Sequence, residues 1–360
     1  MNVLIGYGYY PWISPTYLQR SFERRSGATY VGTAWNSRPG FAATGDVQQI
    51  ATELPEYPSL YLYVDSGEPR YFPRGLTSLE CPTACYLIDV HVRPLELTKQ
   101  AMFFDYAFSA QQDFVAALRR AGHPQAHWLP LACDPEVHRH YDLPKRYDIG
   151  FVGSTRRGYE RRRVLVERLA SRFTINDYQR SYAPPEMSRI YSEARLVFNC
   201  SLRQEINMRA FEGPATGTLL LTDRVAGLSE LFVDREHVLM YDDAHVLDIA
   251  SEFLRDDAVR ERIARQGYEH VRAHHTYDNR ADTILHTIFG TGAPLLAAPL
   301  RRRSDPDVQL AYAELFALMG RLDDTVEQFT RVPGRWRYRL PAARQLALCL
   351  LRRAHYLARA

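Results

Sequence analysis

The residues best suited to chemistry lie between Asn207 and Thr216, in the second half of the chain. Asn207 is a good N-cap for a helix, and Arg209, Glu212 and Thr216 would share one face of that helix. A carboxylate on such a face can accept hydrogen bonds from two ribose hydroxyls, and a guanidinium can bind phosphate. The alternative is an ion pair between Arg209 and Glu212 at the surface.

A glycine and two arginines follow the strand predicted at residues 147–152. Gly153 would allow the backbone to approach a ligand closely, and Ser154 adds a hydroxyl group. Arg156 and Arg157 precede a predicted helix, whose N-terminus is itself electropositive. These features suit a diphosphate, although a tight turn with solvated arginines has the same composition.

The first half of the chain places glycine, acidic and histidine residues at the ends of predicted strands. They are Gly6 and Gly8 at the end of the first strand, Asp65 and Glu68 after the third, and Asp89 and His91 at the end of the fourth. His91 suits a hydrogen bond to a sugar hydroxyl or a phosphate oxygen, and Asp89 would accept the proton of an acceptor hydroxyl. The alternative for each residue is a structural polar pair that holds two loops together.

The elements that must position these residues alternate between strand and helix. The strands are predicted at residues 2–7, 28–34, 59–64, 84–90 and 105–109, and again at 147–152, 196–199, 219–222 and 238–241. Such alternation predicts parallel sheets with helices on both faces, which bind ligands at the carboxyl ends of their strands. The 360 residues exceed one ordinary domain core, and we expect two α/β domains, residues 1–145 and 146–290.

The pattern changes after residue 290. We expect a linker at residues 291–304 and an α-helical extension at 305–360, with its last helix at 341–360. The extension contains a helical hairpin around Gly320, and residues 320–329 resemble the second half of a tetratricopeptide repeat. A helical cap on a domain and a module that binds a protein partner are both open interpretations.

Composition argues against several classes of protein. The net charge of +3 is too small for a protein that coats nucleic acid. No apolar run reaches the roughly 18 residues of a membrane span, no secretory leader is visible, and five sparse cysteines favour reduced thiols in the cytoplasm. Lys99 and Lys145 are the only lysines, so phosphate binding would depend on arginines, amides and helix N-termini. We expect no metal site and no cofactor.

The order of the motifs resembles that of the CgeB-like glycosyltransferases, the spore-maturation group. The matching segments are 129–138, 147–154, 207–212, 227–232 and 275–280, within a similar region of about residues 80–285. The resemblance implies the GT-B architecture, in which two Rossmann-like domains face each other across a cleft. The C-terminal domain would hold a nucleotide-sugar donor.

The resemblance also implies roles for individual residues. Glu212 would bind the ribose of the donor, and Arg209 would lie near the diphosphate. The loop that contains Gly227, Leu228 and Glu230 would pack against the sugar-phosphate through its backbone amides.

Two features depart from the pattern of the broader retaining relatives. Glu205 and Glu212 are seven positions apart instead of eight, which leaves the role of Glu205 open. Pro214 removes a helix hydrogen bond and is expected to bend the helix after Glu212.

The implied activity is metal-independent transfer of a hexose from a nucleotide diphosphate donor to a hydroxyl of a glycan, a protein or a small molecule. Inversion of configuration would require a base such as Asp89, whereas in a retaining reaction the departing phosphate could take the proton. Two alternatives are a nucleotide-sugar epimerase or hydrolase on the same fold, and a non-catalytic sugar-binding scaffold with a docking tail at residues 305–360.

Overall fold

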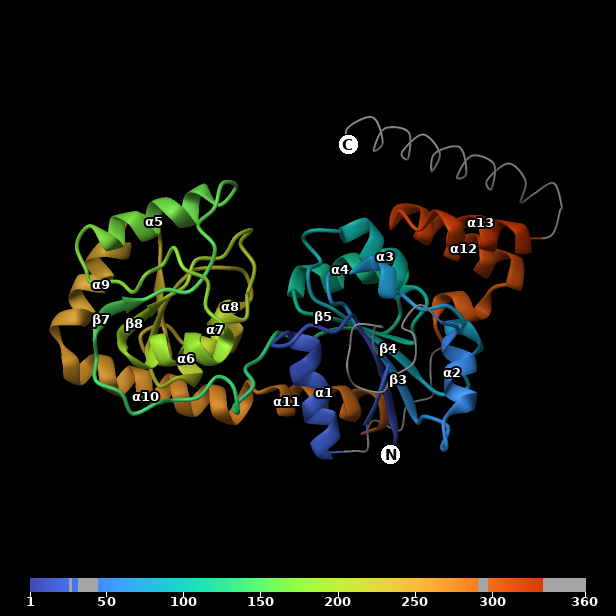
Figure 1. Ribbon diagram of the computed structural model, residues 1–360, viewed down its shortest axis with the longest axis horizontal. Helices are drawn as coiled ribbons and strands as arrows, with labels where there is room; N and C mark the ends of the chain where they lie inside the picture. Colours follow the sequence, from blue (N-terminus) through green and yellow to red (C-terminus); the bar gives the residue numbers. More distant parts are fainter. Residues whose placement is uncertain (26–27, 32–44, 291–296, 333–360) are drawn as a thin grey trace. The chain divides into compact units, whose positions relative to one another are not determined.

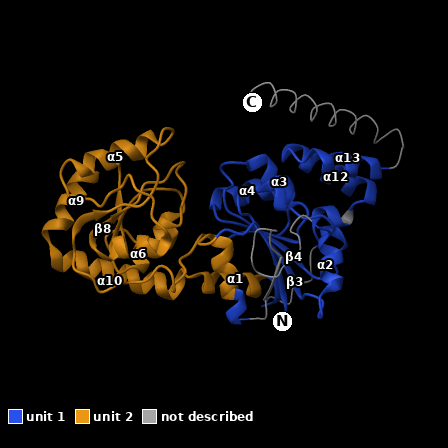
Figure 2. Ribbon diagram, in the orientation of Figure 1, with its two compact units in different colours: residues 1–10, 22–129, 288–360 blue, residues 11–21, 130–287 orange. Residues whose placement is uncertain are grey.

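The computed structural model describes residues 1–25, 28–31, 45–290 and 297–332, which form two compact units (Figures 1 and 2). The first unit comprises residues 1–10, 22–129 and 288 onward, and the second comprises residues 11–21 and 130–287. The chain therefore enters the second unit at Pro130, fifteen residues before the predicted boundary at 145. The predicted linker at 291–304 is described only from residue 297.

The helix α1 (Ser14–Arg25) explains why residues 11–21 belong to the second unit. Its Tyr17 ring lies 5.2 Å from the ring of His138 and 5.6 Å from the ring of Tyr277, measured between centroids. The Ser14 hydroxyl also contacts the sulfur of Met208 at 3.2 Å. A helix that follows the first strand thus packs on residues from the middle of the chain, which local sequence patterns do not reveal.

The first unit is built on a six-stranded parallel sheet in the order β2-β1-β3-β4-β5-β6. Its strands are β1 (Val3–Gly6), β2 (Ala28–Val31), β3 (Leu60–Val64), β4 (Thr83–Leu87), β5 (Tyr106–Ser109) and β6 (Ala126–Trp128). Its helices include α2 (Val47–Glu53), α3 (Pro94–Ala101) and α4 (Gln112–Arg120), with short helical turns at Pro69–Tyr71, Leu76–Ser78 and Pro299–Arg302. The short helix His286–Gly290 spans the boundary between the two units. The five predicted strands of this half are present, and the short β6 is an addition.

The second unit is built on a four-stranded parallel sheet in the order β10-β9-β8-β7. Its strands are β7 (Tyr147–Gly150), β8 (Ala194–Phe198), β9 (Leu219–Asp223) and β10 (Leu239–Tyr241). Its helices are α5 (Glu160–Ala170), α6 (Pro184–Ser192), α7 (Arg209–Ala215), α8 (Leu228–Leu231), α9 (Val246–Arg255), α10 (Asp257–His274) and α11 (Tyr277–Leu285). The prediction of two parallel-sheet α/β domains is confirmed.

Alternate residues of the second sheet face opposite helical layers, as the two-residue period of a strand requires. Leu196 and Phe198 of β8 belong to the core shared with α5 and α9. On the other face, a Cβ atom on Gly213 of α7 would lie 2.9 Å from the Leu220 side chain, so the missing side chain permits close packing. Figure 1 shows α5 and α10 on opposite sides of this sheet.

The C-terminal region forms the predicted hairpin, α12 (Asp305–Leu318) and α13 (Leu322–Arg331), with Gly320 at a φ of 73° between them. Phe316 of α12 is fully buried in the core of the first unit. The Tyr312 ring lies 4.2 Å from the Phe103 ring. The hairpin therefore completes a domain core, as expected of a helical cap. The helix expected at 341–360 lies outside the described residues.

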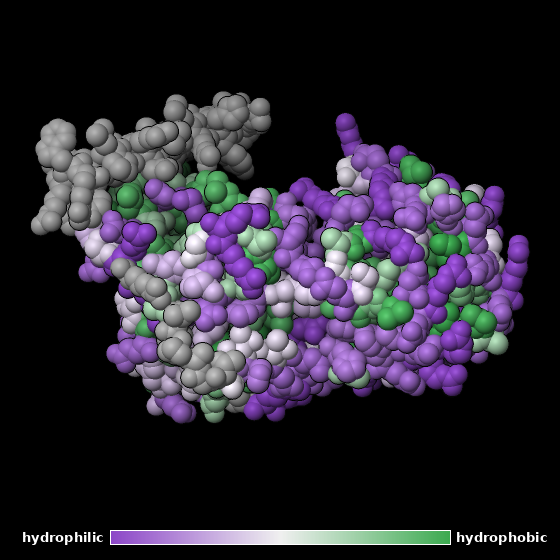
Figure 3. Space-filling view, turned by 180° about the vertical axis from the view of Figure 1, so that it is seen from behind, coloured by the Kyte–Doolittle hydropathy of each residue, from purple (hydrophilic) through white to green (hydrophobic). Residues whose placement is uncertain are grey.

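The surface contains scattered apolar side chains. Figure 3 shows the second unit, from behind, as largely hydrophilic with small separate hydrophobic patches. None of the helices in the described ranges is long and apolar enough to cross a membrane. Cys81, Cys85, Cys133 and Cys200 are free and buried.

We expect Phe316→Ala to lower the free energy of unfolding by about 3–5 kcal/mol, because it removes a buried aromatic ring that the sheet and helices enclose. Val326→Ala on α13 is the matched control, since Val326 is exposed, and it should change stability by less than about 0.5 kcal/mol. Urea denaturation followed by near-ultraviolet circular dichroism measures both. Equal effects of the two substitutions would show that α12 is not part of the core.

Candidate functional site

Arg209 lies where the carboxyl ends of β7 and β8 meet in the second unit. Its Nη1 donates a hydrogen bond to Oδ1 of Asn199, the residue directly after β8, at 3.1 Å. A Cβ atom on Gly153, which follows β7, would lie 3.0 Å from Nη2 of Arg209. The guanidinium therefore covers the Gly153 backbone, and any larger residue at position 153 would push it away. Gly153 and Arg209, predicted separately from sequence, come together.

Asn199 and Asn207 hold this guanidinium in place. The Asn199 amide nitrogen donates to the Thr222 hydroxyl of β9 at 3.0 Å, and its Oδ1 accepts from Nδ2 of Asn207 at 3.1 Å. Asn207 Oδ1 accepts the backbone N–H of Arg209 at 3.1 Å, so Asn207 supports the helix start although α7 begins at Arg209. The Nε atom of Arg209 is buried and has no hydrogen-bond partner among the described residues. This N–H is therefore a donor that the protein leaves unused.

Glu212 is buried, with 8% of its surface exposed, and its Oε1 lies 3.3 Å from Nε2 of His138. The backbone N–H of Asp134 donates to Nδ1 of His138 at 2.9 Å, so a neutral His138 carries its proton on Nε2, facing Glu212. Burial raises the pKa of Glu212 to about 7 and lowers the pKa of His138 to about 3. This pairing contradicts the alternative of a surface ion pair between Arg209 and Glu212. Sequence reasoning assigned no role to His138.

A pocket of about 380 Å³ opens beside Gly153. Its walls are formed by two loops, residues 152–156 after β7 and residues 178–182 before α6. Asn176 ties the loops together, because its side chain accepts from the Phe151 N–H at 2.7 Å and donates to the Phe151 carbonyl at 2.9 Å. Sequence reasoning missed Tyr178 and Tyr182 in the second loop. The signal that could have identified them is the alternation of tyrosine and arginine in residues 178–182, just before a proline.

Of the two arginines predicted to bind the diphosphate, only Arg156 lines this pocket. Arg156 lines the pocket, stacks on the Tyr159 ring at 5.3 Å and donates to its hydroxyl at 3.2 Å. Arg157 is exposed and does not line the pocket. Ser154 also lines it, and its hydroxyl accepts the Arg156 N–H at 3.4 Å.

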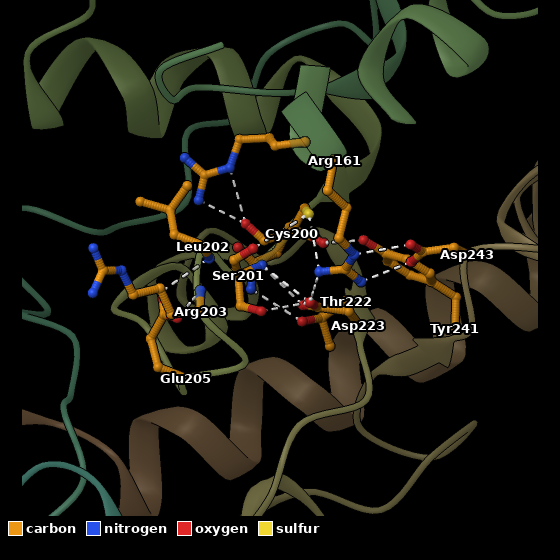
Figure 4. A network of polar contacts seen from close by, with 12 residues as sticks. Arg161, Cys200, Ser201, Leu202, Arg203, Glu205, Thr222, Asp223, Tyr241 and Asp243 are labelled. Carbon is orange, nitrogen blue, oxygen red and sulfur yellow. Dashed lines mark hydrogen bonds and ion pairs between the residues drawn. The ribbon is translucent and has the colours of Figure 1, made fainter. Parts of the chain in front are cut away.

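A polar network fixes the loop that follows Asn199 (Figure 4). Arg161 of α5 reaches Asp223 at 2.8 Å and Asp243 at 2.7 Å, and the Asp223 carboxylate accepts the Ser201 hydroxyl at 2.6 Å. Glu205 accepts the backbone N–H groups of Leu202, at 3.0 Å, and Arg203. The carboxylate of Glu205 therefore stabilises its own loop.

The loop before α8 presents backbone more than side chains. Gly227 has a φ of 79°, a left-handed conformation that favours glycine. The Leu228 side chain is buried, whereas Glu230 is exposed. A ligand at Leu228 would therefore meet main-chain atoms, as the resemblance implies. The predicted bend at Pro214 coincides with the end of α7 at Ala215.

In the first unit, the loops after β1, β3 and β4 lie together. The Gly8 N–H donates to the Ser66 hydroxyl at 3.0 Å. The carboxylate of Asp65, which is 2% exposed, accepts the Gly67 N–H at 3.1 Å. A Cβ atom on Gly67 would lie 3.9 Å from Oδ2 of Asp89. The sequence-predicted residues Gly8, Asp65 and Asp89 are therefore neighbours.

The remaining predicted residues of the first unit differ in environment. Gly6 packs against the Tyr61 side chain, which a Cβ atom would overlap at 2.4 Å. Glu68 accepts the Tyr10 hydroxyl at 3.2 Å. Because β4 ends at Leu87, Asp89 and His91 lie in the following loop instead of in the strand.

Sequence reasoning missed Arg93, which is the cation of this region. It donates to Asp65 at 2.9 Å and pairs with Glu96, and Glu96 in turn accepts from Gln100 at 3.1 Å. Asp65 is thus held in a network that joins the loops after β3 and β4. Across the parts of the chain that the structure describes, no group of three or more histidine, cysteine or acidic side chains is arranged to hold a metal ion.

The second half of the chain is similar in sequence to glycosyltransferases. Residues 138–286 match a family described as glycosyl transferase-like. A D-inositol 3-phosphate glycosyltransferase from Corynebacterium urealyticum is 28% identical over 178 residues, which cover 48% of this chain and 41% of that protein. The match thus spans about two fifths of the length of that curated relative.

Several solved structures share the fold. Anabaena Alr3699/HepE in complex with UDP-glucose has a TM-score of 0.61 at 12% identity over 81% of this chain and 100% of that chain. Sucrose-phosphate synthase from Thermosynechococcus elongatus has a TM-score of 0.58 at 12% identity over 79% and 96% of the two chains. T4 phage BGT in complex with UDP-glucose has a TM-score of 0.55 at 13% identity over 80% and 100%. The predicted GT-B fold is therefore confirmed.

We expect Glu212 to make stability depend on pH. Its pKa is about 7 in the folded protein against an ordinary 4.5, so the folded protein keeps a proton that the unfolded chain releases. The contribution of Glu212 to the free energy of unfolding therefore falls as pH rises between these values, by up to about 3 kcal/mol. The Glu212→Gln variant lacks this titration. Its free energy of unfolding should therefore rise relative to that of the wild type as pH increases. Urea denaturation across this pH range measures the difference, and parallel pH profiles would contradict the buried carboxyl.

Proposed function

We propose that the protein transfers a sugar from a nucleoside diphosphate donor to a hydroxyl group of an acceptor. The observation that carries the proposal is the Arg209 guanidinium, fixed by Asn199 over the Gly153 backbone with a buried N–H left to donate. The glycosyl transferase-like match of residues 138–286 supports it, because that match includes every residue of this arrangement.

The donor would occupy the second unit. Its diphosphate would accept hydrogen bonds from Arg209, from Arg156 and from the amides after Gly153. Tyr178 and Tyr182 offer aromatic faces on which a nucleobase can stack. Uridine is the base we propose, since Anabaena HepE and T4 phage BGT were solved with UDP-glucose.

Glu212 would bind the ribose. Its carboxylate can accept hydrogen bonds from the two ribose hydroxyls once it is ionised, and the Nε2–H of His138 can stabilise that ionised form. Binding of the ribose then draws a proton out of the site, because the free protein holds Glu212 largely protonated below about pH 7.

The chemical step breaks the bond between the anomeric carbon and the β-phosphate oxygen and forms a bond from that carbon to the acceptor oxygen. Negative charge develops on the diphosphate, and the guanidiniums of Arg209 and Arg156 would stabilise it without a metal ion. In an inverting reaction Asp89 would take the acceptor proton. In a retaining reaction the departing phosphate would take it.

The order of the sequence motifs supports a more specific proposal. We propose a CgeB-like hexosyltransferase that acts in the cytoplasm on a glycan, protein or small-molecule acceptor. The carboxylates Asp65, Glu68 and Asp89 and the imidazole of His91 would belong to the acceptor side. The hairpin α12–α13 resembles part of a tetratricopeptide repeat. If the protein has a protein partner, residues 305–360, which include this hairpin, would bind it.

An epimerase or a hydrolase on the same fold would turn over the donor without an acceptor. Incubating the protein with UDP-glucose alone and following UDP and free sugar by chromatography separates these activities. A transferase should leave the donor largely intact until an acceptor is added. A non-catalytic scaffold would consume no donor in either condition.

We expect Arg209→Met to weaken UDP binding at least about tenfold, because it removes a charge-assisted hydrogen-bond donor from the diphosphate. Glu212→Ala should weaken binding through the ribose while the fold is retained. Arg172→Met is the control, since Arg172 is exposed and does not line the pocket. Isothermal titration calorimetry measures the three affinities, and unchanged affinity in both site variants would refute the proposed donor site.

We expect UDP-glucose to bind equally well in a magnesium buffer and in excess EDTA, because guanidiniums supply the positive charge. Calorimetric titration of the same protein stock in both buffers tests this. A large loss of affinity in EDTA would assign the diphosphate to a metal ion instead.

A further inference from the structure

A second pocket of about 380 Å³ lies in the second unit, at the opposite edge of the sheet from the proposed donor pocket. Leu219, the first residue of β9, and Arg195, near the start of β8, form part of its wall. Because the four strands are parallel, this edge holds their amino ends. The helix α10 closes one side with Arg260, Arg265 and Tyr268.

The lining of this pocket combines an apolar wall with cations. Leu219 and Tyr268 are apolar, and Lys145, Arg195, Arg260 and Arg265 carry positive charge against the single carboxylate of Glu261. The volume is within the range of small-molecule sites, which are mostly apolar with a few placed polar groups. An apolar body with one negative group matches such a surface.

Two of the cations have no ion-pair partner among the described residues. The Lys145 ammonium donates to the carbonyls of Ser192 at 2.9 Å and Ala194 at 2.8 Å, which leaves one of its three N–H bonds. Arg265 is exposed, and the described part of the chain offers it no hydrogen bond or ion pair. Arg195 and Arg260, by contrast, share the carboxylate of Asp257 at 2.5 and 2.6 Å. Because no carboxylate in the described ranges neutralises them, Lys145 and Arg265 are the cations best placed to bind an anion.

We propose that this pocket binds a small organic anion, a carboxylate or phosphate ester with an apolar body, as an effector of the donor site. The anion would bind Lys145 and Arg265, and its apolar body would lie against Leu219 and Tyr268.

The segment 138–145 connects the two sites. At one end His138 contacts Glu212 at 3.3 Å. Further along, His140 and Lys145 line the second pocket. Nδ1 of His140 bonds the carbonyl of Thr216, directly after α7, at 2.9 Å. The helix that begins with Arg209 thus ends at the wall of the second pocket. Occupancy there can bias the position of α7, and the affinities of the two sites are then coupled reciprocally.

Phenyl phosphate is a suitable probe, with benzoate as the carboxylate form and benzyl alcohol as the uncharged analogue. We expect calorimetry on the full chain to detect phenyl phosphate and benzoate more strongly than benzyl alcohol. Arg265→Glu should weaken phenyl phosphate binding about tenfold or more. Arg262→Glu is the control, because Arg262 is exposed on the same helix, does not line the pocket and bonds only Gln266 among the described residues, at 3.1 Å. Equal affinity in the two variants, or equal binding of benzyl alcohol, would overturn the proposed site.

The donor-site variant Arg209→Met should bind phenyl phosphate as the wild type does, and loss of binding would place the probe in the donor pocket and refute the second site. The effector role rests on the proposed function, and we expect saturating phenyl phosphate to change the UDP affinity. An unchanged UDP affinity would refute that role. Failure of UDP to bind at all, with phenyl phosphate still bound, would instead refute the proposed function alone.

Discussion

The hydrogen bond between Arg209 and Asn199 is the contact on which the second unit's site depends. Asn199 is fixed from several directions, because its amide bonds Thr222 and its carbonyl accepts the Tyr241 hydroxyl at 2.9 Å. These bonds connect β8, β9 and β10 at their carboxyl ends. The Arg209 guanidinium is thereby held against the Gly153 backbone. Its side chain is ordered when the protein folds, so ligand binding does not have to supply the entropy cost of ordering it.

Most arginines near this site serve structure. Arg162 is 5% exposed and donates to the Cys200 carbonyl at 3.0 and 2.6 Å. Arg280 donates to the carbonyls of Pro130 and Leu131 at 2.7 and 2.9 Å. A planar group with five donors suits such carbonyl contacts. The richness of the chain in arginine therefore reflects its scaffold as well as its site. Among the described arginines of the second unit, Arg209 is distinguished by a buried Nε–H without a partner.

The sequence was sufficient for the fold and for the residues that end its strands. Strand and helix alternation predicted both sheets, and Gly153, Arg209 and Glu212 were found because they follow β7 and β8. His138 and Arg93 were missed, since their importance comes from contacts with segments distant in the chain. The same reason explains the boundary at Pro130, because the packing of α1 on His138 and Tyr277 leaves no local pattern.

The chain crosses between its two units repeatedly, and the core of the first unit includes α12, near the end of the chain. During synthesis the sheet of β1–β6 would emerge from the ribosome long before the helix that covers Phe72 and Phe103. The nascent first unit would then expose aromatic surface while the second unit is translated, a situation that favours aggregation and chaperone binding. A gene fragment that stops before residue 305 should therefore give an insoluble product, even though both sheets are encoded in full.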